Sequence, residues 1–164
     1  MTGSSASDPK RDLLRHTLAT LAYRGGKTLR DAPSSFGDFR ACDGARTSRQ
    51  ILAHIGDLME WALSMAQGKQ HWHVSEPLAW DKERERFHAV LQRFDDFLAS
   101  ENALQAVPEN LFQGPIADAL THIGQLALLR RMAAAPVKGE NFFIAEVSAG
   151  RVGADQAPPK FEFD

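Results

Sequence analysis

Apolar residues recur at spacings of three and four along most of this chain, which predicts helices with one buried face rather than strands. The first apolar stripe consists of Leu13, Leu14, Leu18, Leu21 and Ala22. Ser7 or Asp8 can cap the backbone N–H groups at the start of this helix, and Pro9 suits its first turn. Gly25 and Gly26 are expected to weaken or kink its later part.

Two further stripes predict a second and a third helix. The second stripe consists of Ile51, Ile55, Leu58, Ala62 and Met65. Thr47 or Ser48 provides its cap, and Gly68 marks its end. After a loop over residues 69–77, residues 78–100 read as a charged amphipathic helix whose apolar side carries Phe87, Val90, Leu91, Phe94 and Leu98. Its Lys, Glu and Arg residues then form a solvated face.

A fourth helix is expected after Pro108 and the pair Gly114-Pro115, and it ends before Pro136. Its apolar positions are Ile116, Leu120, Ile123 and Ala127. The residues after Pro136 contain an apolar run but no alternation long enough to demand a sheet. The pattern therefore predicts an all-α fold, a four-helix bundle with a C-terminal extension.

At 164 residues the chain has the length of one domain. We expect a flexible N-terminus over residues 1–7, a helical bundle over residues 8–135, and an extension over residues 136–164 that packs on the bundle. The formal net charge of −2 gives no basic surplus for neutralising phosphates, so we expect no nucleic-acid partner. No run of about 18 apolar residues predicts a membrane span. No signal-peptide pattern is present, and Cys42 is the only cysteine, so we expect a cytoplasmic protein.

Three residues on two of these helices are candidate metal ligands. His54 interrupts the apolar stripe of the second helix, where an imidazole needs a hydrogen-bond partner or a metal. Asp118 and His122 are four residues apart on the fourth helix, so both side chains can point to the same place. Two imidazoles and a carboxylate suit Zn, Ni, Fe or Mn. The alternative is a structural polar core without an ion.

The segments around these residues resemble two motifs of the DinB/YfiT superfamily. Residues 51–58 (ILAHIGDL) resemble the motif of its second helix. Residues 118–125 (DALTHIGQ) resemble a later helix motif, commonly a His-x-x-x-His followed by x-Gly-Gln. The resemblance also covers the order and length of the four expected helices.

The resemblance implies a DinB/YfiT-type four-helix bundle with a divalent metal site. In that family three histidines commonly bind the ion, and the first and last correspond to His54 and His122. The middle position holds Asp118, which replaces a neutral nitrogen donor with an anionic oxygen. Asp118 either serves as a ligand for a harder or more weakly bound metal, or accepts a hydrogen bond from His122 without an ion.

The resemblance further implies a metal-dependent enzyme, a thiol S-transferase or a hydrolase, acting on a small molecule or with a low-molecular-weight thiol. The alternative is a non-enzymatic dimeric bundle with a structural polar core and a stress-related or regulatory binding role. Relatives of this type are often dimeric. Leu126, Leu128 and Leu129 add apolar positions beside the core series of the fourth helix and suggest a second buried face, so we expect a homodimer.

The remaining reactive side chains favour simpler interpretations. His71 and His73 flank Trp72 and read as loop residues, because no third metal ligand is identifiable near them; the alternatives are a second metal site or a cover over the first. Cys42 would be a nucleophile only beside a base or a positive charge. Arg130 and Arg131 suit the carboxyl end of a helix dipole, with a role in binding an anionic substrate as the alternative.

Overall fold

The computed structural model describes residues 8–163, and the expected flexible N-terminus at residues 1–7 lies outside them. The helices are α1 (Pro9–Leu29), η1 (Ser34–Asp38), α2 (Ser48–Ala66), α3 (Trp80–Ala99), α4 (Pro108–Leu111), η2 (Phe112–Ile116), α5 (Ala117–Met132) and η3 (Phe142–Ile144). Two short strands, β1 (Gly139–Glu140) and β2 (Glu162–Phe163), complete the described elements. The expectation of an all-α fold is confirmed, with one small two-stranded sheet added.

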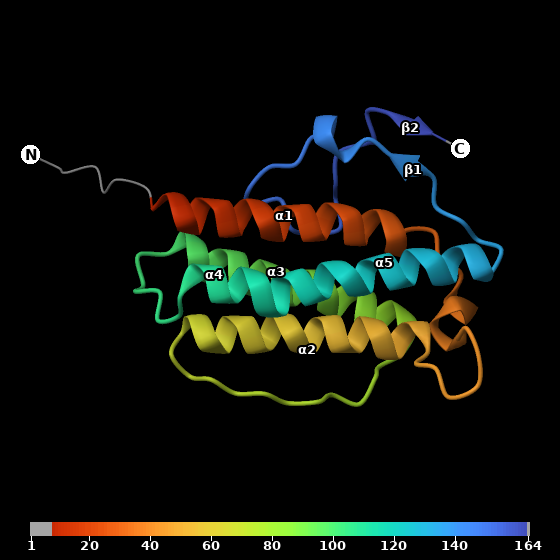
Figure 1. Ribbon diagram of the computed structural model, residues 1–164, viewed down its shortest axis with the longest axis horizontal. Helices are drawn as coiled ribbons and strands as arrows, with labels where there is room; N and C mark the ends of the chain where they lie inside the picture. Colours follow the sequence, from red (N-terminus) through yellow and green to blue (C-terminus); the bar gives the residue numbers. More distant parts are fainter. Residues whose placement is uncertain (1–7, 164) are drawn as a thin grey trace, which may run out of the picture.

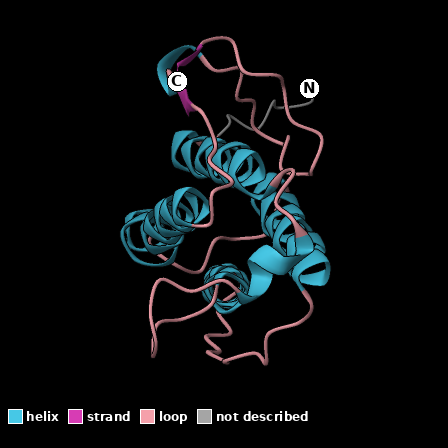
Figure 2. Ribbon diagram, turned by 90° about the vertical axis from the view of Figure 1, so that its right-hand side faces the viewer, coloured by secondary structure: helices cyan, strands magenta, loops and turns pink. Residues whose placement is uncertain are grey.

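The long helices α1, α2, α3 and α5 form a bundle in which α1 and α2 are diagonally opposed. Each of these two packs against both α3 and α5 (Figures 1 and 2). Figure 1 shows that α2 and α3 run in the same direction, because the loop between them runs back along the length of α2. The consequence for function is that α2 and α5, which carry the candidate ligands, are direct neighbours.

Local sequence explains where the first two long helices begin. The Asp8 side chain accepts a hydrogen bond from the backbone N–H of Lys10, at the cap of α1. Thr47 caps α2 in a capping box, because its side chain accepts from Gln50 N–H while the Gln50 side chain accepts from Thr47 N–H. The cap expected at Thr47 is therefore confirmed.

Gly25 and Gly26 do not end α1, which continues through both to Leu29, and the weakening or kink expected from them stays a prediction. Both glycines are buried in the bundle. A Cβ atom built on Gly25 would lie 2.6 Å from the Phe87 ring of α3. Tertiary packing against α3 thus compensates for the low helix propensity of glycine, and the absent side chain gives Phe87 its space.

The fourth long helix begins earlier than the Gly114-Pro115 signal suggested. Helical structure starts at Pro108 in α4 and continues through the π-helical segment η2 into α5. Pro115 lies inside η2 rather than at a helix start. A proline lacks the N–H for the regular helical ladder and clashes with the preceding turn, and the wider π turn accommodates both effects.

The C-terminal extension lies along α1 and is tied to it by buried polar contacts. Tyr23 donates a hydrogen bond to Glu140, and Lys27 pairs with Glu140 at 2.8 Å and with Glu162 at 2.6 Å. The strands β1 and β2 pair in antiparallel fashion, which holds residues 162–163 beside residues 139–140. Val152 is fully buried in the bundle core.

The fourth long helix, α5, lacks the second apolar face that we expected beside its core-facing one. Leu126 and Leu129 lie in the core of their own chain, and only Leu128 of the three leucines is exposed. The second apolar face inferred from these residues is therefore wrong, and the homodimer stays a prediction. In the part of the chain that the structure describes, no helix has both the length and the apolar character needed to cross a membrane.

Candidate metal centre

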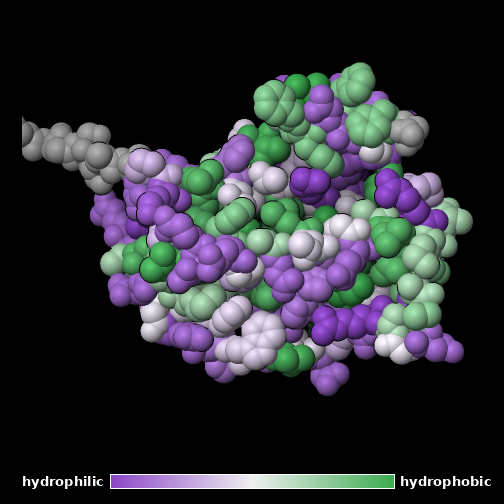
Figure 3. All heavy atoms as spheres, in the orientation of Figure 1, coloured by the Kyte–Doolittle hydropathy of each residue, from purple (hydrophilic) through white to green (hydrophobic). Residues whose placement is uncertain are grey.

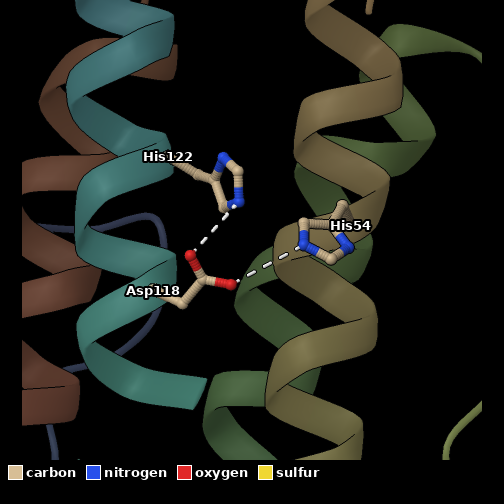
Figure 4. A group of neighbouring side chains, drawn as sticks. All are labelled: His54, Asp118 and His122. Atoms are coloured by element: carbon tan, nitrogen blue, oxygen red, sulfur yellow. Dashed lines mark ion pairs between the residues drawn. The ribbon is translucent and has the colours of Figure 1, made fainter. Parts of the chain in front are cut away.

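The side chains of His54, Asp118 and His122 point toward one place between α2 and α5 (Figure 4). One potential donor atom from each residue lies within 4.8 Å of the others. The Asp118 carboxylate stands between the imidazoles, 3.8 Å from His54 Nε2 and 3.4 Å from His122 Nε2. Within residues 8–163 no other group of three such donors is this close.

Helix geometry explains why these three residues meet. Asp118 and His122 are one turn apart on α5, on the flank that faces α2. His54 lies between the buried residues Ile51 and Leu58 of α2, so its side chain is directed inward from the helix surface. The contact between α2 and α5 then brings the imidazole of one helix to the donors of the other.

A hydrogen bond from His122 to Gln125 determines which ring nitrogen is free. His122 Nδ1 lies 2.8 Å from Gln125 Oε1, an acceptor, so Nδ1 carries the proton in the neutral ring. The lone pair of His122 is therefore on Nε2, the atom nearest Asp118. In metal sites a similar outer hydrogen bond fixes the tautomer of a ligating histidine.

The three donors do not satisfy one another with hydrogen bonds. The 3.8 Å separation of His54 Nε2 and Asp118 is too long for one, and the 3.4 Å contact at His122 joins two acceptors when the ring is neutral. Burial lowers the pKa of His54, as do the neighbouring His122 and, to a smaller extent, Arg46. The lowered pKa of His54 favours its neutral ring, whose nitrogen lone pair can bind a cation together with the Asp118 carboxylate oxygens.

The spacing of the donors is close to what a first-row ion requires. Ligands about 2.1 Å from a tetrahedral ion lie about 3.4 Å from each other. Asp118 Oδ1 lies 3.4 Å from His122 Nε2 and Asp118 Oδ2 lies 3.8 Å from His54 Nε2, so each imidazole has a carboxylate oxygen near this spacing. The widest separation in the group, at most 4.8 Å, would have to close by up to about 1.4 Å around a tetrahedral ion. The residues present therefore fit a divalent ion.

Solvent reaches this site from the side of Asp118. The Asp118 side chain is 48% exposed, whereas those of His54 and His122 are 22% and 12% exposed. An ion held here would have protein on the histidine side and open space on the carboxylate side. That arrangement resembles catalytic metal sites, which keep at least one position free for water or substrate.

Trp72 is a neighbour of the site that the sequence pattern did not identify. Its ring packs edge-on against His54, with ring centroids 6.0 Å apart, and against Trp61 at 5.5 Å. The loop that carries Trp72 is fastened to α2, because Ser75 donates two hydrogen bonds to Asp57. Asp57 in turn pairs with Arg86 of α3 at 2.5 Å. A tryptophan between two histidines in this loop was the available signal.

The other histidines do not join the candidate ligands. His73 Nε2 lies 2.9 Å from Ser75 Oγ, and His71 is exposed in the same loop. His88 is on α3 with its Nδ1 3.1 Å from the Val152 carbonyl oxygen, and His16 is on α1. Cys42 is exposed in the loop before α2.

Arg130 has a structural role that accounts for its burial. Its guanidinium donates to the backbone carbonyls of Thr28, Arg30 and Ala135, so it joins the carboxyl ends of α1 and α5. These carbonyls have no helical partner and need a donor. Arg131, by contrast, is exposed, and its side chain makes no hydrogen bond or ion pair among the described residues.

Comparison of the chain with protein-family models, with curated proteins and with solved structures gives no significant match.

Proposed function

We propose that this protein is a divalent-metal-dependent enzyme of the DinB type, a thiol S-transferase or a hydrolase. The observation that supports it is the convergence of His54, Asp118 and His122 from two helices on one point. Two nitrogen donors and one carboxylate suit Zn, Ni, Fe or Mn. The substrate is a small molecule, with a low-molecular-weight thiol as the second reactant in the transferase version.

When bound, a divalent ion would act as a Lewis acid that lowers the pKa of a coordinated water or thiol and so generates a nucleophile near neutral pH. The protein residues hold that ion and shape its surroundings. Gln125 keeps the His122 lone pair on Nε2. Asp118 supplies a carboxylate oxygen as the third ligand, and its negative charge would stabilise a bound cation.

Trp72 and Trp61 form an aromatic wall beside the same site. We assign to this wall the apolar part of the substrate, and the exclusion of bulk water from the histidine side of the site. We assign no separate general base. A cytoplasmic location belongs to the same proposal, supported by a single cysteine, Cys42, that forms no disulfide.

Thermal unfolding and turnover with controlled metal content test this function. Protein treated with a chelator and then reloaded with Zn²⁺, Ni²⁺, Mn²⁺ or Fe²⁺ should unfold at a higher temperature when loaded. It should also consume a low-molecular-weight thiol in the presence of an electrophile, or hydrolyse an ester or amide, only when loaded.

Matched variants separate this function from a structural polar core. His122→Ala and Asp118→Ala should lose the metal-dependent shift in unfolding temperature, and His71→Ala should keep it. If chelation changes neither unfolding nor turnover in the wild-type chain, the enzymatic proposal is wrong. The non-enzymatic alternative with a structural polar core then holds.

A further inference from the structure

A cavity lies between α1, α5 and the start of the C-terminal extension. Its volume is about 160 Å³, and its lining includes side chains from all three of these segments. The face that α1 and α5 turn to the viewer in Figure 3 carries strongly hydrophilic side chains beside hydrophobic ones of the extension. Neither the metal proposal nor the packing of the bundle uses this cavity.

The charges around this cavity are all positive. Arg24 from α1, Arg131 from α5 and Lys138 from the extension line it, together with Lys27. Lys27 is neutralised by its ion pairs with the buried Glu140 and the exposed Glu162, whereas the side chains of Arg131 and Lys138 form no ion pair among the described residues. No acidic side chain lines the cavity. Arg24, Arg131 and Lys138 thus give the lining an excess of positive charge, which Glu162 near Lys138 offsets only in part.

The walls between these cations are apolar. They are formed by Leu120, Ile123, Ala127, Val137 and Phe142. The Arg24 guanidinium lies over the Phe142 ring, 4.2 Å from its centroid, so its position is fixed by a cation–π contact. A cavity of about 150 Å³ in another protein is large enough to bind benzene. The space therefore accommodates one aromatic ring or a short branched alkyl group.

This cavity is separate from the candidate metal centre. At 100° per residue, the lining residues of α5 from Leu120 to Arg131 lie on the flank of the helix that faces α1. Asp118 and His122 lie on the opposite flank, which faces α2. A ligand in the cavity would not contact the metal ligands.

We propose that this cavity is a binding site for a small organic anion, a carboxylate attached to an aromatic or short alkyl body. The carboxylate would be held by Arg131 and Lys138 at the rim, since a planar guanidinium binds a carboxylate through two parallel hydrogen bonds. The apolar body would fill the space between Ile123 and Phe142. The carboxylate of such a ligand would supply negative charge to this cationic lining.

Titration of the full-length protein with benzoate, by calorimetry or ligand-observed NMR, tests this site. Benzoate should bind with a Kd of about 1 mM or below. Benzyl alcohol, which has the ring without the charge, and inorganic phosphate, which has the charge without the ring, should each bind at least about tenfold more weakly. Raising the ionic strength should weaken the benzoate complex.

Three variants test whether benzoate binds in this cavity. Gly124 lines the cavity, and a Cβ atom built on it would meet nothing within 4 Å, so Gly124→Leu fills the space without disrupting the helix. Gly124→Leu should abolish benzoate binding, and Arg131→Gln should weaken it by about tenfold. Arg40→Gln, at an exposed arginine outside the cavity, should leave it unchanged.

Three outcomes would overturn the proposal. If benzoate does not bind to the wild-type chain, the proposed site does not exist. Equal binding to Gly124→Leu places the ligand elsewhere on the molecule. Equal binding of benzyl alcohol or of phosphate shows that ring and charge are not recognised together, which contradicts the assigned ligand class.

Discussion

Removal of the Gln125 side chain should weaken metal binding without touching a ligand. Gln125→Ala deletes the 2.8 Å hydrogen bond from His122 Nδ1 while keeping a residue that favours helix. The ring of His122 is then free to place its proton on Nε2, the nitrogen that faces Asp118. Metal binding would then require the His122 proton to return to Nδ1, and the free energy of that step would reduce the metal affinity.

The expected size of this effect follows from the exposure of Gln125. Loss of an outer hydrogen bond to a metal ligand typically costs 10- to 100-fold in affinity, about 1.4 to 2.7 kcal/mol. Gln125 is exposed, so water can accept the same hydrogen bond after the substitution. We therefore expect a loss of about tenfold, at the lower end of that range.

Calorimetric titration with Zn²⁺ and Ni²⁺ measures this difference. Gln92→Ala is the matched control, because Gln92 is an exposed helical glutamine that bonds to Asp96 one turn away on α3. Gln125→Glu offers a carboxylate acceptor that raises the basicity of His122, and it should bind metal at least as tightly as the wild type. If Gln125→Ala, Gln92→Ala and the wild type bind with equal affinity, Gln125 does not position His122 for a metal.

Stability measurements test the packing and the association of the chain. Gly25→Ala should lower the free energy of unfolding in urea by about 1–3 kcal/mol, because the added methyl would clash with Phe87. Gly124→Ala should raise it by about 0.5–1 kcal/mol, because its methyl meets nothing and alanine favours the helix. Equal effects at the two glycines would contradict this packing. Burial lowers the pKa of His88 from 6.5, so the unfolded chain binds that proton more readily and stability should fall as the pH drops below about 6.5. His88→Gln should flatten this pH dependence of the urea midpoint, and an unchanged slope would exclude His88 as its source. Sedimentation equilibrium at micromolar concentration should give twice the 18.1 kDa chain mass, and a pure monomer would refute the homodimer.

Helix identity and the candidate ligands were accessible from the sequence, because both depend on local spacing. The stripe from Ile51 to Met65 and the cap at Thr47 predicted α2 closely. The four-residue interval between Asp118 and His122 is enough to put both on one flank of a helix. The same interval cannot show that α2 is the neighbouring helix, which depends on how the bundle packs.

The errors came from places where tertiary structure overrides a local signal. Gly25 and Gly26 have low helix propensity, but α1 continues through both, with Gly25 packed against Phe87. Pro115 suggests a helix start, but a π-helical segment carries the chain through it. Leu126 and Leu129 suggested a second face, yet both are needed by the core of their own chain.

Trp72 and Gln125 needed the structure for another reason. The contact of Trp72 with His54 depends on the path of a loop without regular structure, which is set by the hydrogen bonds of Ser75 to Asp57. Gln125 is one turn from His122, but many helical residue pairs at that spacing make no contact. Neither role follows from residue type and spacing alone.

Metal analysis of the protein purified without an affinity tag tests the central proposal most directly. We expect close to one first-row divalent ion per chain in the wild type, retained in His71→Ala and lost in His54→Ala and His122→Ala. The bound ion should also dissociate below about pH 6, where protons occupy the imidazole nitrogens. A wild-type chain that holds no ion as purified and takes up none of Zn²⁺, Ni²⁺, Mn²⁺ and Fe²⁺ when titrated would contradict it.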